Sequence, residues 1–303
     1  MSYRILQETA VRYFLEVART GSIKEAALRL NVVPSAVSRQ IARLEAELGT
    51  LLFDRHARGL IPNAAGELLA SHAKRVQQEI ERVTTDIHAL RGVKVGRVRV
   101  ASVDGLVHDF MPELIAQFRR SFAGIRVDLE VCLHGEVARK IRDGDADVGI
   151  TLSVMPEPEI IVELRHPGPV LAIVSPQHPL AQFRQVALSQ VVAYPLALPP
   201  AESSVRQLID ASCSRQGLNY EAVFCSNNMD SLAGLAGAGD GVIAFYGELS
   251  IRRRLAERTL VGIPFIDREF NERYLEIQTS ARGGLSPAGR TFVECLKLAM
   301  LGV

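Results

Sequence analysis

The side chains with the most varied hydrogen-bonding chemistry in the N-terminal part lie in one short segment, from Ser35 to about Leu48. Apolar residues recur there at three- and four-residue steps, which predicts a helix that buries Val37, Ile41, Leu44 and Leu48. The other face would carry hydroxyl, guanidinium and amide groups, from Ser35, Ser38, Arg39, Gln40 and Arg43. Such groups hydrogen-bond to phosphates and base edges, and a helix fits the major groove of DNA, about 12 Å wide. The segment therefore has the makeup of a recognition helix, whose N-terminal N–H groups also attract phosphate.

Two shorter helices are expected to hold this helix in place. The first has an apolar face over residues 11–18, and Ser22 caps the second, which runs over 23–30. Pro34 suits the first turn of the third helix, since its fixed φ is helical and its missing N–H has no acceptor there. The three segments predict a helix-turn-helix, and we count Ser22 among its DNA contacts.

A small hairpin is predicted directly after these helices. Residues 51–55 and 60–62 flank a turn at 57–59, which would form a wing with Arg55 and Arg58 near its tip. Charge alone does not distinguish a DNA-binding domain from an ordinary helical domain, because residues 1–60 hold nine Lys or Arg against six Asp or Glu, a modest excess.

Composition indicates a folded protein of two or three compact units. The chain has 303 residues, of which 48% are hydrophobic and 23% charged, with a net charge of +1. It contains neither an apolar run of membrane-spanning length nor a signal-peptide core, so a cytoplasmic protein without a membrane partner is expected. The four cysteines form no close pair, which favours reduced, mostly buried thiols at Cys132, Cys213, Cys225 and Cys295.

The hydrophobic pattern changes near Gly92. Before it, residues 63–90 predict one long helix whose apolar stripe needs a partner. After it, residues 97–101 alternate as a strand does, and strands and helices then alternate to the C-terminus. This order predicts an α/β fold with a parallel or mixed sheet covered by helices.

The order of these motifs resembles the LysR-type transcriptional regulators. The resemblance is gap-free through residues 14–18, 21–30, 34–45 and 48–55 and continues through 61–67, where Asn63 can cap the long helix. Many members have Gln-Pro where this chain has Pro34-Ser35, so we expect Ser35 to replace the contact of that Gln. Weaker matches follow in the C-terminal half, at 111–118, 144–150, 178–181, 239–243 and 285–292.

The resemblance implies a winged helix-turn-helix over 1–62, a linker and dimerisation helix over 63–92, and an effector-binding domain over 93–303. That domain would look like a periplasmic binding protein, with lobe I over 94–164 and 268–303 and lobe II over 165–267. The implied partners are double-stranded DNA with an interrupted palindrome, a second copy in a homodimer and commonly a homotetramer, a small-molecule effector, and RNA polymerase. No cofactor or metal is implied.

Effector contacts are expected beyond the carboxyl ends of the strands, where helix N-termini present free N–H groups. The candidates, each of which also suits a plain helix cap or loop, are Ser102, Val103, Asp104, Gly135, Glu136, Thr151, Ser203, Ser204, Asn228, Met229 and Phe245. The hydroxyls of Ser102 and Ser204 suit a carboxylate. Asp104 and Glu136 would repel an anion unless they are paired, so an amine or a zwitterion stays open as the effector.

Two alternatives are an α/β enzyme and a redox-responsive regulator. The chain has no G-x-S-x-G, P-loop or HExxH motif, and its histidines show no metal-ligand spacing. The glycine-rich run 234–241 ends a predicted helix, which is the wrong context for a dinucleotide. A redox switch would depend on Cys213 and Cys225, which belong to no supporting motif. We therefore expect a regulator rather than an enzyme.

Overall fold

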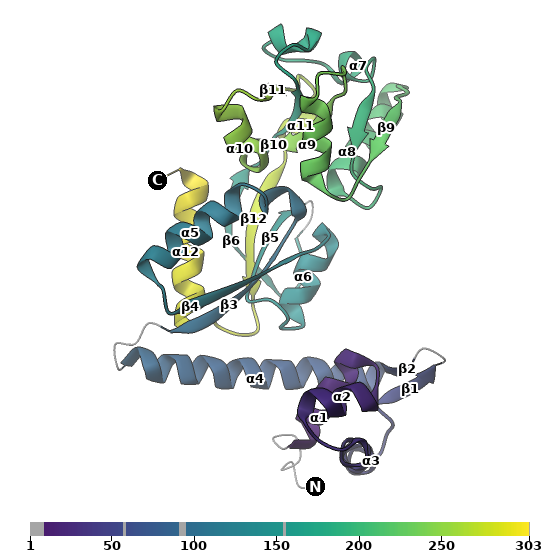
Figure 1. The fold of residues 1–303 in the computed structure, drawn as a ribbon, viewed down its shortest axis with the longest axis vertical. Helices are drawn as coiled ribbons and strands as arrows, with labels where there is room; N and C mark the ends of the chain where they lie inside the picture. The colour runs from purple at the N-terminus through teal and green to yellow at the C-terminus, as the bar shows by residue number, and fades with distance from the viewer. Residues whose placement is uncertain (1–8, 57–58, 91–94, 154–155, 303) are drawn as a thin grey trace. The chain divides into compact units, whose positions relative to one another are not determined.

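The computed structural model describes residues 9–56, 59–90, 95–153 and 156–302. The chain divides into two compact units, one up to Glu81 and one from Arg82 onward (Figure 1). The boundary lies inside the long helix α4 (Ala64–Leu90).

The first unit packs three helices around one small core. These are α1 (Thr9–Thr20), α2 (Ile23–Leu30) and α3 (Pro34–Leu48). Phe14, Val37 and Leu44 are fully buried in that core, which also takes Ala26 and Ala27 from the small-residue face of α2. Leu48 does not join the core as predicted: 41% of its surface is exposed, because it is the last residue of α3 and Gly49 follows in a left-handed conformation.

The predicted wing is present as strands β1 (Phe53–His56) and β2 (Gly59–Pro62), paired antiparallel. It is fastened to the helices where Leu60 N–H donates to Gly21 O over 2.8 Å. Gly21 has a φ of +66°, and a Cβ on Gly59 would lie 2.4 Å from Gly21 O. Glycine is therefore required at both positions for the strand and the turn to approach so closely.

The long helix α4 begins as predicted at Asn63, whose Oδ1 accepts the N–H of Gly66 over 3.0 Å. Leu69 is buried in the core of the first unit, and Ala73, one turn further along α4, is also buried. Further along, Ile80, Val83 and Ile87 are between 46% and 62% exposed. This later part of the apolar stripe is therefore exposed.

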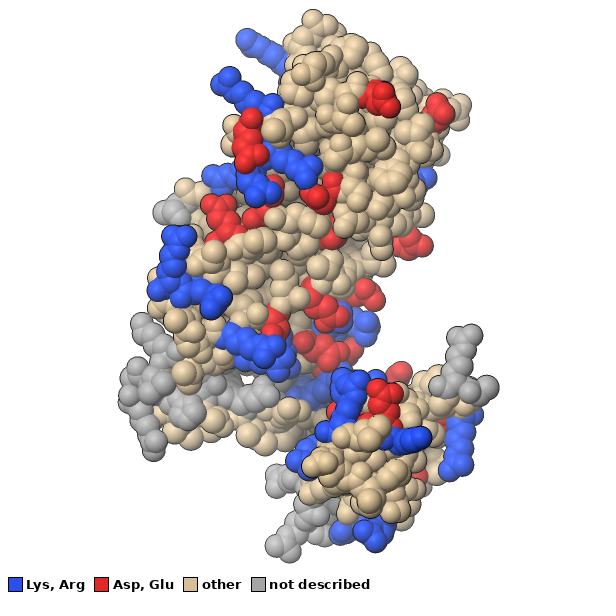
Figure 2. Space-filling view, in the orientation of Figure 1, with Lys and Arg blue, Asp and Glu red and all other residues tan. Residues whose placement is uncertain are grey.

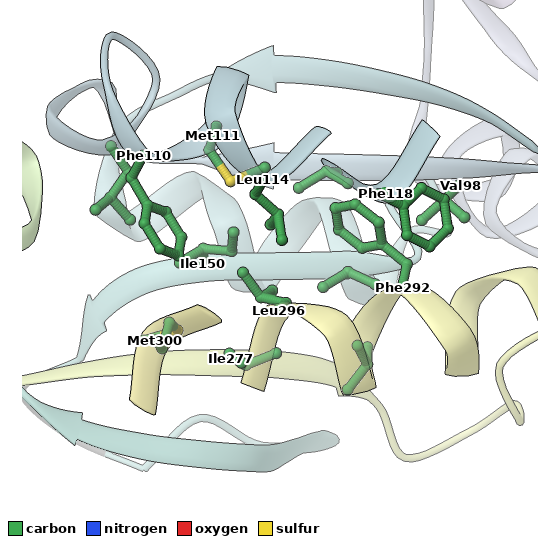
Figure 3. Packing of buried hydrophobic residues seen from close by; sticks show 14 of the residues in the cluster. Val98, Phe110, Met111, Leu114, Phe118, Ile150, Ile277, Phe292, Leu296 and Met300 are labelled. Atoms are coloured by element: carbon green, nitrogen blue, oxygen red, sulfur yellow. The ribbon is translucent and has the colours of Figure 1, made fainter. Parts of the chain in front are cut away.

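Lobe I of the second unit is a five-stranded sheet in the order β4 (Ile125–Val131), β3 (Gly96–Ser102), β5 (Val148–Ser153), β12 (Tyr274–Ser280) and β6 (Ile160–Pro167). The first three strands are parallel, whereas β12 is antiparallel to β5 and β6. Helices α5 (Phe110–Ser121) and α12 (Pro287–Leu301) cover one face, and α6 (His134–Arg142) covers the other (Figure 1). Figure 3 shows the core on the α5 and α12 side, where Phe118 and Phe292 meet edge to face with ring centroids 5.2 Å apart.

Lobe II has a three-stranded sheet in the order β10 (Ala244–Gly247), β7 (Val170–Val174) and β11 (Val261–Pro264). Beside it lies the parallel pair β8 (Leu196–Leu198) and β9 (Ala222–Cys225). The helices of this lobe are α7 (Leu188–Val191), α8 (Ser204–Gln216), α9 (Met229–Gly237), α10 (Glu248–Ala256) and α11 (Arg268–Asn271). The sequence prediction of an α/β fold with a winged helix-turn-helix and a two-lobed domain is confirmed.

The two crossovers between the lobes lie a few residues later than the predicted boundaries at 164/165 and 267/268. Strand β6 continues to Pro167, which pairs with Tyr274 in the lobe I sheet. Phe270 of α11 stacks on Phe265 at 4.1 Å between ring centroids and belongs to the lobe II core. The crossovers are joined to each other, because Gly168 N–H donates to Arg273 O over 2.8 Å.

Candidate functional site

Helix α3 presents the predicted polar face to solvent. Ser35, Ser38, Arg39 and Arg43 are exposed and Gln40 is half-buried, while Val37, Ile41 and Leu44 fix the opposite face in the core. Among the described residues Arg39 has no carboxylate partner, whereas Arg43 Nε donates to Glu47 Oε1 over 3.1 Å. The N-cap residue Val33 provides no side-chain acceptor. The first turn of α3 is thus suited to phosphate and base contacts.

Ser22 and the wing flank this helix face. Ser22 Oγ accepts the N–H of Glu25 over 3.4 Å as the N-cap of α2, so its hydroxyl hydrogen remains free to donate. Arg55 is exposed on β1. Arg58, the other predicted wing contact, lies outside the described residues. Figure 2 shows basic side chains spread around this unit with acidic ones among them, in keeping with its modest excess of charge.

The second site is a cavity of about 350 Å³ between the lobes, which is lined from both of them. Five of the predicted effector residues line it: Val103, Asp104, Ser203, Ser204 and Met229. The remaining lining is largely apolar, with Leu106, Leu133, Leu152, Val170, Val205 and Leu275 among its residues. Such a cavity suits a compact ligand with an apolar body and a polar group.

Six predicted effector residues do not line the cavity: Ser102, Gly135, Glu136, Thr151, Asn228 and Phe245. Phe245 is 1% exposed and packs in the lobe II core against Phe265, so the prediction that it contacts effector is wrong. Ser102 is fully buried, and its hydroxyl donates to Val103 O. Thr151 is buried on β5, and Asn228 Oδ1 caps α9 by accepting the N–H of Ser231 over 2.9 Å.

Both acidic candidates are engaged within the protein. Asp104 Oδ2 accepts the N–H of Met229 over 2.8 Å, a bond that joins lobe I to lobe II at the first turn of α9. The ring of His108 lies 3.4 Å from the same carboxylate. Glu136 Oε2 accepts the N–H of Leu133 over 3.2 Å and caps its own helix. These bonds leave both carboxylates negatively charged, and Asp104 lines the cavity, so an amine or a zwitterion remains a candidate effector.

Among the residues that the sequence prediction missed are His134, which lines the cavity, and Arg273, which bonds to the lining residue Ser204. His134 opens α6 and lines the cavity, and its Nδ1 is buried without a hydrogen-bond partner. Burial and then the charge of Arg273 lower the pKa of His134. Arg273 precedes β12 and is 9% exposed, and burial lowers its pKa to about 10. The position of His134 directly after a strand is a signal that the sequence offered, whereas nothing in the sequence marked Arg273.

The cysteines are less buried than predicted. Only Cys213 is buried, Cys225 is exposed on β9, and the other two lie between these extremes. Burial raises the pKa of Cys213 and raises that of Cys132, which lines the cavity, to about 11. A thiol with a raised pKa holds little of the reactive thiolate, so these two residues do not favour a redox switch.

The described residues contain no group of three or more His, Cys, Asp or Glu side chains able to hold a metal ion. Likewise, none of the described helices is both long and apolar enough to cross a membrane. An exposed polar helix face in one unit and a cavity between two lobes in the other are the arrangement expected of a ligand-responsive DNA-binding regulator.

Comparison with known proteins identifies the family. The model described as bacterial regulatory helix-turn-helix protein, lysR family, matches residues 9–67, and that of the LysR substrate binding domain matches residues 91–300. The chain therefore belongs to the LysR family and is a DNA-binding transcription regulator rather than an enzyme.

Individual relatives agree over nearly the whole length. The RuBisCO operon transcriptional regulator of Allochromatium vinosum is 28% identical over 289 residues, which are 94% of this chain and 93% of the relative. Full-length OxyR from Pseudomonas aeruginosa shares the fold with a TM-score of 0.73 at 18% identity, covering 96% of this chain and 93% of OxyR. CbnR in complex with its target DNA has a TM-score of 0.63 at 20% identity, covering 99% of this chain and all of CbnR.

Proposed function

We propose that the chain reads an interrupted palindromic operator as a homodimer within a homotetramer, and that a small molecule in the interlobe cavity changes this reading. The observation that carries the proposal is the exposed face of α3, where Ser35, Ser38 and Arg39 lie together on the first two turns. A guanidinium in the major groove can bond two acceptors of one guanine. CbnR, which has the same fold, has been solved in complex with its target DNA, and this supports DNA binding by the present chain.

The open stripe of α4 supports self-association. Ile80, Val83 and Ile87 recur at the spacing of a helix-pairing seam and are at least 46% exposed. Strand β9 offers a second apolar surface, because it ends its two-stranded sheet and all of its residues are exposed. Paired copies would set two reading helices side by side, which requires two operator half-sites.

Two further parts of the proposal, the RNA polymerase partner and the cellular location, rest on the family alone. A family regulator works at a promoter, so we propose RNA polymerase as an additional partner and the cytoplasm as the place of action. The effector is proposed to bind the cavity between the lobes, whose apolar lining and five predicted contacts support it.

The test begins with selection of bound fragments from the source genome by the purified full chain. On the selected operator, Arg39→Ala should cost about 1–3 kcal/mol of specific binding if Arg39 reads a base with two bonds. Arg55→Ala should weaken binding to all sequences alike and flatten its salt dependence, as expected for a phosphate contact.

Arg19→Ala is the matched control, since Arg19 is an exposed arginine of the same unit whose guanidinium is bound to Glu16. An unchanged operator affinity in Arg39→Ala, measured beside this control, would show that α3 is not the reading helix.

A further inference from the structure

The polar face of α3 is bordered by two exposed apolar residues. Val33 is 63% exposed and is the N-cap of the helix, and Pro34, its first residue, is exposed as well. Ser35, Ser38 and Arg39 follow within the first two turns. A single exposed aliphatic side chain is ordinary on a protein surface. Beside a face that binds another molecule, however, such a side chain becomes part of the contact, and its chemistry restricts what it can contact.

The turn that carries Val33 is fixed by the fold. Asn31 has a φ of +55°, and the N–H of Val32 donates to Ala27 O over 3.0 Å. The side chain of Val32 packs against the core of the N-terminal unit. Pro34 fixes its own φ and restricts the residue before it to an extended conformation, and Val33 has a φ of −78° and a ψ of 145°. The place of Val33 is thus set before DNA binds, so little conformational freedom is lost on contact.

The chemistry of this edge of α3 limits what it can recognise. The side chain of Val33 has no hydrogen-bonding atom, and Pro34 lacks a backbone N–H. The base edges in the major groove present hydrogen-bond donors and acceptors, and the apolar group among them is the C5-methyl of thymine. An aliphatic side chain gains an apolar contact from that methyl group, whereas it would cover the polar edges of the other bases without bonding to them.

We propose that Val33 determines part of the operator specificity by contacting the C5-methyl group of one thymine in each half-site, with the ring of Pro34 beside the same contact. The N-terminal residues of the second helix of a helix-turn-helix contact base edges, which brings this edge of α3 to the bases. Many LysR-type regulators have Gln-Pro where this chain has Pro34-Ser35, so an apolar contact takes the place of an amide contact. The inference rests on the proposed use of α3 as the reading helix, and it adds the base and the chemical group that are read.

The test compares thymine with uracil, which has the same hydrogen-bonding groups and lacks only the methyl group. Each thymine of the operator selected from the source genome is replaced in turn by deoxyuridine. The dissociation constant of the full-length chain is then measured for each duplex. One position in each half-site should weaken binding about fourfold, as expected when one methyl group is removed from an apolar contact. The other thymines should show little change.

Val33→Ala connects this effect to the side chain. Val33 is exposed, so the substitution removes no contact from the core, and the variant should fold. Its affinities for the thymine and uracil duplexes should be nearly equal at the sensitive position, because the methyl group has lost its partner. A uracil effect of the same size in Val33→Ala and in the wild type would mean that the methyl group does not act through Val33, and the assignment would be wrong.

Leu28→Ala is the matched control. Leu28 is an aliphatic residue of the same unit and is 74% exposed, but it lies on α2. The deoxyuridine series should give the same result in Leu28→Ala as in the wild type. A uracil effect that is lost in Leu28→Ala and kept in Val33→Ala would assign the methyl contact to α2 and overturn the inference.

Measurement of Arg39→Ala on the same duplexes separates this inference from the proposed function. An unchanged operator affinity in Arg39→Ala would contradict the reading role of α3, and the inference about Val33 would fail with it. If Arg39→Ala weakens binding but no deoxyuridine substitution does so, only the inference about Val33 is wrong. The same holds if the half-sites of the selected operator contain no thymine.

Discussion

The residues that would meet DNA come from one stretch of the N-terminal unit, from Ser22 to the wing, whereas those that line the cavity come from both lobes and from the crossover at Gly168 and Pro169. Arg39 and Arg273 illustrate the difference, since neither has a carboxylate partner among the described residues. Arg39 is exposed, so water solvates its charge until DNA replaces the water. Arg273 is 9% exposed, and its guanidinium is held within the fold by its bond to the backbone oxygen of Ser204. An exposed arginine can meet an incoming anion directly, whereas a buried arginine acts through the groups that surround it.

The largest effect is expected from breaking one core and leaving the other intact. Phe118→Ala removes a fully buried ring that packs on Phe292, so the effector domain should lose about 3–5 kcal/mol of unfolding free energy. Phe14→Ala should destabilise only the N-terminal unit. Urea unfolding monitored by amide hydrogen exchange measures the stability of each region separately. If both regions lose stability in both variants, the two cores are not independent.

A second variant tests whether α4 joins two copies. Ile80→Glu places a charge in the exposed apolar stripe and should shift the chain toward monomer, with a loss of about 2 kcal/mol or more in association if Ile80 is central to the interface. Sedimentation velocity measures the change. Gln77→Glu adds the same charge to an exposed polar position of α4 and is the control. Equal oligomeric states for the two variants would place the dimer interface elsewhere.

Asp104→Ala examines the bond that crosses between the lobes. Loss of the carboxylate leaves the N–H of Met229 without its acceptor, which should cost about 1–3 kcal/mol. Amide exchange at the start of α9 should accelerate, and Asp104→Asn, which retains an acceptor oxygen, should show a smaller change. Unchanged exchange in the alanine variant would mean that this bond does not hold the lobes.

The smallest effect is expected when the pH is changed, and it concerns the stability of the effector domain only. Because burial and Arg273 lower the pKa of His134 below its ordinary value of 6.5, the unfolded chain takes up a proton there before the folded chain does. The free energy of unfolding should therefore fall as the pH drops through about 6.5. Below the pKa of His134 in the folded state, both states carry the proton, so His134 no longer changes the free energy of unfolding.

His134→Gln should remove this part of the slope in urea titrations. His178, whose pKa burial also lowers, should retain its own contribution of the same sign. A slope unaffected by His134→Gln would mean that the imidazole titrates as freely in the folded chain as in the unfolded one.

Most of the N-terminal unit was predictable because its signals are local. The spacing of Val37, Ile41 and Leu44, the cap at Ser22 and the proline at position 34 each act within one or two helical turns. The error at Leu48 has the same origin. The spacing of apolar residues predicts burial up to the last residue of α3, but it does not show where along the helix the packing partners end. The cavity was predicted less well, because the end of a strand indicates where a residue lies but not whether its side chain is already bonded.

By itself, the sequence determined the order of the elements, the polar face of α3 and the position of the two-lobed domain, since caps and periodicities depend on near neighbours. Only the tertiary structure decided which polar groups are available to a ligand. Asp104 and Met229 are 125 positions apart, and Arg273 and Ser204 are 69 apart. Contacts over such separations depend on how the lobes pack, so only the packing placed Asp104 and Ser204 in the cavity lining and left Ser102 and Phe245 buried outside it.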